Sequence, residues 1–166
     1  MDITNTEKLI LINQYKILAK LDPDSSSYYE KAENILSNGY RFLYGSLDNW
    51  IDDEMSEDKS EFVMDILSLY RAIGHIDDTD DQLGGYSNRV FRGFDGNEEG
   101  EYFSFTRFVI EEEGKFAEQK GGEASVDGYN SHCPMVPTYA AMIQRWESRG
   151  KKYQLTLEEI KAILGE

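Results

Sequence analysis

Hydrophobic positions along the chain recur mainly at the three- and four-residue spacing of amphipathic helices. The clearest example is the stripe Phe62, Ile66, Leu69 and Ile73, which falls on one face of a helix. Ser56 stands just before this stripe, and a serine side chain can accept a hydrogen bond from a free amide of the first turn. The pattern therefore predicts a helix that begins after residue 56 and buries one face.

Two helices are predicted nearer the N-terminus. Apolar side chains over residues 5–21 cover more than one face, which is typical of a helix contacted on two sides. Thr4 and Glu7 stand in front of it at the spacing of a capping box. Ser27 and Glu30 repeat this spacing ahead of the next apolar stripe. We therefore expect a capping box at the start of both helices.

The second half of the chain predicts three further helices. Residues 102–110 alternate in part like a strand, but their length and Gly114 behind them favour a largely buried helix. Residues 135–149 carry a helical stripe. Thr156 and Glu159 form another capping box before the last apolar segment.

Helical segments with short connections and little strand signal predict an all-α fold. We expect about six to eight helices. The chain has 166 residues, and a length of ~100–200 residues is typical of one domain. The sequence therefore predicts a single compact helical domain over residues 1–166.

Charge narrows the range of partners. The formal net charge is −15, and such a surface repels phosphate-rich polymers and anionic lipids. The basic group Arg145, Arg149, Lys151 and Lys152 follows a predicted helix, where positive charge suits the helix dipole. We therefore expect no nucleic acid and no membrane among the partners.

The chain has features of a cytoplasmic protein. Cys133 is the single cysteine, so no disulfide can form within the chain, and a lone cysteine fits a reducing compartment. The N-terminus does not have the pattern of a secretory signal. The aliphatic run Leu9 to Ile12 is far shorter than the ~20 residues of a membrane-spanning helix. These features predict a cytoplasmic location.

Five short runs resemble the YfbU family of bacterial proteins. They are Leu-Ile-Leu-Ile-Asn-Gln-Tyr-Lys at 9–16 with Leu-Asp-Pro at 21–23, Gly-Phe-Asp at 93–95 followed by Arg107-Phe108, and Tyr-Gln-Leu-Thr-Leu-Glu-Glu-Ile at 153–160. The resemblance implies a helical, cytoplasmic bacterial protein that self-associates. It carries over no established activity and no catalytic or binding residues.

Metal and catalytic motifs are weak. Asp95, Asn97, Glu99 and Gly100 match the start of an EF-hand loop, but Thr106 stands where the loop needs a bidentate glutamate. The acidic cluster at 77–81 lacks both the glycine and the final glutamate of such a loop. We therefore predict no metal site.

Nucleophilic and phosphate-binding motifs are also missing from the sequence. No serine stands in Gly-x-Ser-x-Gly, and no glycine-rich phosphate loop occurs. His132 and Cys133 are neighbours, and adjacent side chains usually diverge, so they are a poor base and nucleophile. The sequence predicts no catalytic residue and no cofactor, and it favours a non-enzymatic protein.

The most unusual polar residues stand inside apolar stretches: Asn13 and Gln14 interrupt the first helix, and Arg107 stands between Phe105 and Phe108. A buried arginine needs a charged or carbonyl partner. Asp95 is a reasonable partner, and Arg92 shares the neighbourhood. Either these three residues form a buried ion pair, or they bind a ligand.

Two functions remain open at this point. The first is a self-associating interaction or regulatory protein, a homo-oligomer of two or more subunits that also binds an unidentified protein partner. The alternative is a small-molecule-binding protein or enzyme with a pocket near Arg92, Asp95 and Arg107.

Overall fold

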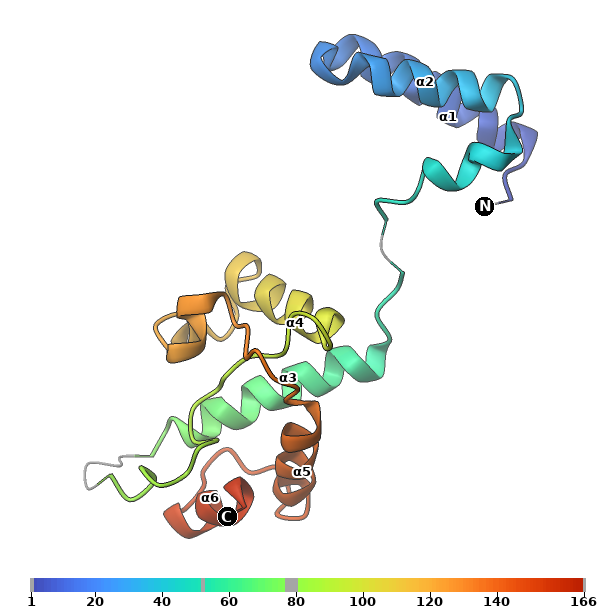
Figure 1. The fold of residues 1–166 in the computed structure, drawn as a ribbon. Helices are drawn as coiled ribbons and strands as arrows, with labels where there is room; N and C mark the ends of the chain where they lie inside the picture. Colours follow the sequence, from blue (N-terminus) through green and yellow to red (C-terminus); the bar gives the residue numbers. More distant parts are fainter. Residues whose placement is uncertain (1, 52, 77–80, 166) are drawn as a thin grey trace. The chain divides into compact units, whose positions relative to one another are not determined.

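The computed structural model describes residues 2–51, 53–76 and 81–165. These residues form six α-helices with short 3-10 and π-helical turns and longer loops between them, and no strand occurs among them, so the predicted all-α fold is confirmed (Figure 1). The chain falls into two compact units, Met1–Glu54 and Met55–Glu166, which are described separately below. A single domain over residues 1–166 stays a prediction.

The first unit is a helical hairpin. Helices α1 (Asn5–Leu21) and α2 (Ser26–Ser37) pack side by side and are joined by the 3-10 turn Pro23–Ser25 (Figure 1). The predicted capping box of α1 is confirmed: the Thr4 backbone N–H donates to Glu7 Oε2 at 2.7 Å, and the Glu7 N–H donates to Thr4 Oγ1 at 3.3 Å.

The capping box predicted at Ser27 and Glu30 is wrong. Helix α2 begins at Ser26, directly behind the 3-10 turn, and Ser25 in front of it makes no side-chain cap. The cap lies earlier, where Asp22 Oδ1 accepts from the Ser25 N–H at 3.4 Å. Pro23 explains the difference, because its fixed φ starts a helical turn before the serines are reached.

A small core holds the hairpin together. It consists of buried Ala32, Ile35, Leu36, Tyr44 and Leu47, with Ile3, Leu11, Ile12 and Tyr15 packed against them. Tyr44 comes from the 3-10 turns Arg41–Ser46 that follow α2. The core uses only the side of α1 that faces α2, and no residue of α1 is itself buried.

The second unit is built around helix α3 (Glu57–Ile73). It contacts α4 (Gly100–Arg107) and α5 (Val136–Glu147), and α5 contacts α6 (Leu157–Leu164) (Figure 1). The predicted stripe of α3 is largely confirmed, since Ile66, Leu69 and Ile73 are buried while Phe62 is only half-buried.

The helix predicted over residues 102–110 is confirmed against the strand alternative. Helix α4 continues into the π-helical turn Phe108–Glu112, and Thr106, Val109 and Ile110 are buried. The last capping box is confirmed too, because the Thr156 N–H donates to Glu159 Oε2 at 2.9 Å and the Glu159 N–H donates to Thr156 Oγ1 at 3.2 Å.

Two loops cross closely beside α4 and α5. The Phe94 N–H donates to the Tyr129 carbonyl at 3.0 Å, and the Ser131 N–H donates to the Phe94 carbonyl at 3.1 Å, which makes one isolated parallel bridge. Gly93 has φ +81°, and a Cβ there would lie 1.8 Å from the Tyr129 oxygen. Only glycine fits this crossing, and the crossing places Arg92 beside the loop at 123–132.

Candidate functional site

The most unusual surface of the first unit is the side of α1 that points away from α2. Ile10, Gln14, Ile17 and Leu21 recur at four, three and four residues, with Asn13 beside them, so they share one side of the helix. We call these five residues the outward face of α1. Ile10 exposes 52% of its surface, Ile17 56% and Leu21 74%.

The outward face of α1 is uncharged, although the chain has a net charge of −15. Burial of a large aliphatic side chain contributes ~1.5–3 kcal/mol, so leaving three of them in water forgoes a sizeable part of that stabilisation. Large exposed apolar patches commonly mark interaction sites. The spacing of four and three residues is also that of a helix–helix seam.

A second exposed apolar group follows α2. Phe42 exposes 97% of its surface and Trp50 72%, and Ile51 is exposed as well. The only polar group of the Trp50 side chain, its indole N–H, donates to the Leu47 carbonyl at 3.1 Å. The first unit therefore shows apolar side chains from two segments.

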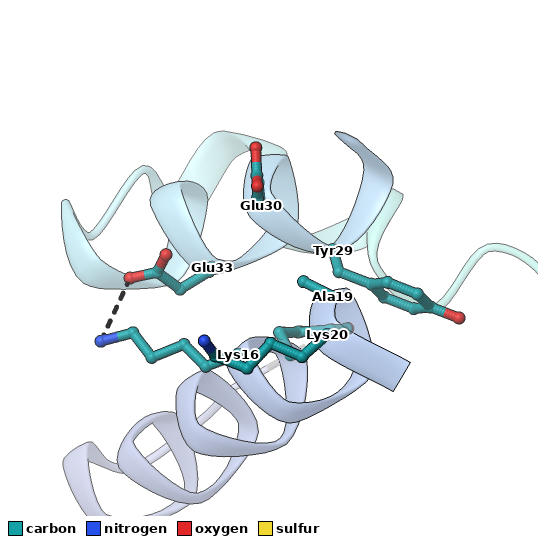
Figure 2. A pocket seen from close by; sticks show the side chains of 7 residues that line it. Lys16, Ala19, Lys20, Tyr29, Glu30 and Glu33 are labelled. Carbon is teal, nitrogen blue, oxygen red and sulfur yellow. Dashed lines mark ion pairs between the residues drawn. The ribbon is translucent and has the colours of Figure 1, made fainter. Parts of the chain in front are cut away.

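The groove between α1 and α2 is a poorer candidate. It has a volume of about 290 Å³ and is lined by Tyr15, Lys16, Ala19, Lys20, Tyr29, Glu30 and Glu33. Lys16 pairs with Glu33 across it at 3.6 Å. In Figure 2 the Glu30 carboxylate points away from the two lysines, and Tyr29 directs its hydroxyl outward. The polar groups do not converge, so the groove is a product of hairpin packing.

The three residues singled out from the sequence lie in different surroundings. Asp95 is buried and accepts from the backbone N–H groups of Asn97 at 2.7 Å and Glu98 at 3.1 Å, so it caps the turn before α4. Arg107 is exposed rather than buried, which corrects our expectation. Its guanidinium carbon lies 5.6 Å from the centre of the Phe103 ring.

The described residues contain no ion pair between Asp95 and either arginine. The physical reason is that a long arginine side chain can cover an aromatic ring while its charge stays in water. Phe105 and Phe108 flank Arg107 in sequence, but neighbouring helical residues point to different sides. The ligand-binding alternative for these residues stays a prediction.

The sequence interpretation missed the main role of Glu99. This buried carboxylate accepts three backbone N–H groups, from Asp95 at 3.0 Å, Met135 at 2.9 Å and Val136 at 2.7 Å. It therefore caps the start of α5 from a distant part of the chain. Asp95 and Glu99 also belong to the partial EF-hand match that was rejected from the sequence, and here both carboxylates bind backbone amides.

Arg92 lines a pocket of about 210 Å³ at the loop crossing. We call it the Arg92 pocket; its walls are Phe91, Arg92, Glu123, Ala124, Asp127, Asn130, Ser131 and His132. His132 Nε2 is paired with Asp127 Oδ2. The Ser131 hydroxyl donates to the Cys133 carbonyl at 2.7 Å. From the sequence, His132 was considered only as a poor partner of its neighbour Cys133, and Asp127, which lies five residues before it, was not identified.

Asn130 fixes the shape of the Arg92 pocket. Its Oδ1 accepts from the backbone N–H groups of Gly96 at 3.2 Å and His132 at 3.1 Å. Tyr129 and His132 have positive φ, +70° and +54°, which is uncommon for residues other than glycine. Strained backbone persists only where surrounding contacts hold it, and it is frequent at functional sites.

Two further observations bear on metals and membranes. Among residues 2–51, 53–76 and 81–165, no three metal-binding side chains gather around one point, while Asp77, Asp78 and Asp80 of the acidic cluster lie outside those residues. Within the same ranges, every helix is too short or too polar to span a bilayer.

These features define a class: an all-α protein whose first hairpin presents an apolar helix side. The YfbU domain model matches residues 1–165, and the chain belongs to the YfbU family, as the sequence resemblance suggested. It is similar to a UPF0304 protein of Methanocaldococcus jannaschii, with 39% identity over 167 residues that cover 98% of each chain.

Proposed function

We propose that this protein is a non-enzymatic, cytoplasmic interaction protein that self-associates through the outward face of α1. The observation that carries the proposal is the exposure of Ile10, Ile17 and Leu21 on one uncharged side of a helix. The other side of α1 already packs on α2. Apolar residues on two sides of a helix are typical of a helix that is contacted on both sides.

A second copy of the chain is the occupant that fits this surface best. Ile10 and Ile17 lie at equal distances from the Asn13–Gln14 step. Two antiparallel α1 helices around a twofold axis at that step therefore bring each Ile10 level with Ile17 of the other copy. Such a surface is complementary to itself, as the interface of a symmetric dimer must be.

The polar centre of the outward face also suits a second copy. Asn13 and Gln14 are exposed, and each amide carries both donors and an acceptor. Amides of two copies can thus satisfy one another across the axis. A single polar position within an apolar helix seam is known to fix register and oligomer state.

Sedimentation velocity of the full chain tests this proposal. We expect the unmodified protein to be a dimer or larger at micromolar concentration, and Ile17→Asp to be a monomer with an unchanged helical circular dichroism spectrum. Val126→Asp is the matched control, because Val126 is 89% exposed in the second unit, and it should leave the oligomer intact.

A monomeric unmodified protein would overturn the proposal, as would an Ile17→Asp oligomer of unchanged size. If Ile17→Asp instead lowers the stability of a monomer, the outward face is covered by the same chain and not by a second copy.

A further inference from the structure

We propose that the Arg92 pocket binds a small zwitterion with one carboxylate and one ammonium group, of the size of a free amino acid. This inference is independent of self-association, because every wall of the pocket comes from the second unit. It concerns a site that the outward face of α1 does not use.

Arg92 supplies a free cation at the pocket wall. Its backbone N–H donates to the Tyr139 hydroxyl at 3.1 Å, and that hydroxyl donates to the Gly93 carbonyl at 3.2 Å. The side chain is exposed, and the described residues offer its guanidinium no hydrogen bond or ion pair. A guanidinium binds a carboxylate through two parallel N–H···O bonds, so Arg92 can hold the carboxylate of a ligand.

Asn130 adds a donor beside Arg92. Its Oδ1 is occupied by two backbone N–H groups, from Gly96 and His132. The amide nitrogen is therefore the end of this side chain that remains to donate. Arg92 and Asn130 both favour a ligand oxygen that accepts hydrogen bonds.

Glu123 and Asp127 bring the opposite charge to the same pocket. Asp127 pairs with His132 through one oxygen, which leaves its other oxygen as an acceptor. These two carboxylates attract an ammonium group, and the guanidinium of Arg92 attracts a carboxylate. A ligand with an ammonium group toward the carboxylates and a carboxylate toward Arg92 meets favourable charge at both ends.

The size and walls of the pocket limit the ligand further. A volume of about 210 Å³ is below the ~300–1,000 Å³ of sites for drug-sized molecules. Phe91 and Ala124 supply apolar wall for a short side chain. The close crossing at Gly93 and Tyr129 keeps Phe91 and Arg92 against the 123–132 loop without any ligand.

Isothermal titration calorimetry with the full chain tests this inference, using the twenty free L-amino acids one at a time at up to 10 mM. We expect saturable one-to-one binding of at least one of them. The same amino acid without its carboxylate, and the same one N-acetylated, should each bind at least tenfold more weakly.

Arg92→Gln should weaken binding at least tenfold while the circular dichroism spectrum stays unchanged, since the Arg92 backbone contacts remain. Arg41→Gln is the matched control, because Arg41 is an exposed arginine of the first unit that pairs with Asp2. It should bind like the unmodified protein.

Three results would overturn the inference: no saturable heat with any of the twenty amino acids, unchanged binding by Arg92→Gln, or equal binding of the N-acetylated compound. The last result would show a carboxylate site without a subsite for the ammonium group.

Discussion

The carboxylate of Glu99 lies 2.7 Å from the backbone nitrogen of Val136, the first residue of α5. Thirty-seven residues separate the two along the chain. The same carboxylate accepts from Met135 and Asp95, so one buried side chain joins the start of α5 to the turn before α4. A negative charge at this position also suits the positive end of the α5 dipole.

Glu99→Ala should destabilise the second unit by about 3 kcal/mol or more, because a buried donor left without a partner costs ~1–3 kcal/mol and three are left here. Urea unfolding followed by the fluorescence of Trp146 in a Trp50→Phe background measures the change. Glu98→Ala is the matched control, since the Glu98 side chain is exposed, and it should cost less than ~0.5 kcal/mol. Equal effects of the two changes would contradict the capping role.

Gly93→Ala should prevent the loop crossing. The backbone at Gly93 has a positive φ, and an added Cβ would overlap the Tyr129 carbonyl. We expect a loss of roughly 3 kcal/mol or more, or failure to fold, seen in thermal unfolding. Gly85→Ala is the control, because no atom lies within 4 Å of a Cβ there, and an unfolding temperature near that of the unmodified protein is expected.

The pair of Tyr129 and Glu111 gives a prediction on pH. The Tyr129 hydroxyl donates to Glu111 Oε1 at 2.8 Å, and this bond is the main reason why the pKa of Glu111 lies below its ordinary value, with the charges of Lys120 and Arg107 assisting. Because the folded-state pKa is lowered, the stabilisation is present above the unfolded pKa of about 4.3. It is lost as the pH falls through the lowered folded-state pKa.

Tyr129→Phe should therefore raise the pKa of Glu111 toward its ordinary value, as a carboxyl titration by NMR would measure. Burial and the Glu111 charge together raise the pKa of Tyr129 itself, so its hydroxyl stays a donor throughout this range. Tyr153→Phe, a change at an exposed tyrosine, should leave the titration of Glu111 as it was. An unchanged Glu111 pKa in Tyr129→Phe would show that the hydrogen bond is not its cause.

A charge exchange at Gln14 tests the symmetry of the proposed dimer. Gln14 of both copies lies near the twofold axis, so Gln14→Lys and Gln14→Glu should each weaken self-association by repulsion of like charges. Mixing the two variants should restore dimers that contain one copy of each, which native mass spectrometry resolves. Random mixing of the two chains would exclude the antiparallel arrangement, whatever the total amount of dimer.

The parts of the fold that were predicted correctly depend on neighbours in sequence. The caps at Thr4 and Thr156 use a partner three residues away, and the stripe of α3 repeats within one helix. Both signals are complete in a short window of sequence. The failure at Ser27 is also local, because Pro23 and Asp22 had already started a helical turn.

The candidate sites were harder to predict because they depend on distant segments. Two of the three bonds of Glu99, from Met135 and Val136, appear only when the loop at 95–99 meets the start of α5, and neither segment shows this by itself. Arg107 was misplaced because hydrophobic neighbours in sequence do not tell on which side of a helix a residue lies. The pairing of His132 with Asp127 forms in a loop without periodicity, in which Gly128, Tyr129 and His132 all have positive φ.

Helix α1 has consequences for how the gene tolerates mutation. One side of the helix supports the hairpin core through Leu11, Ile12 and Tyr15, and the opposite side carries the outward face. The flank that contains Lys16 and Lys20 has no residue of the hairpin core and none of the outward face. A saturation mutagenesis library should therefore find α1 less permissive than an ordinary surface helix, with accepted changes concentrated on that flank.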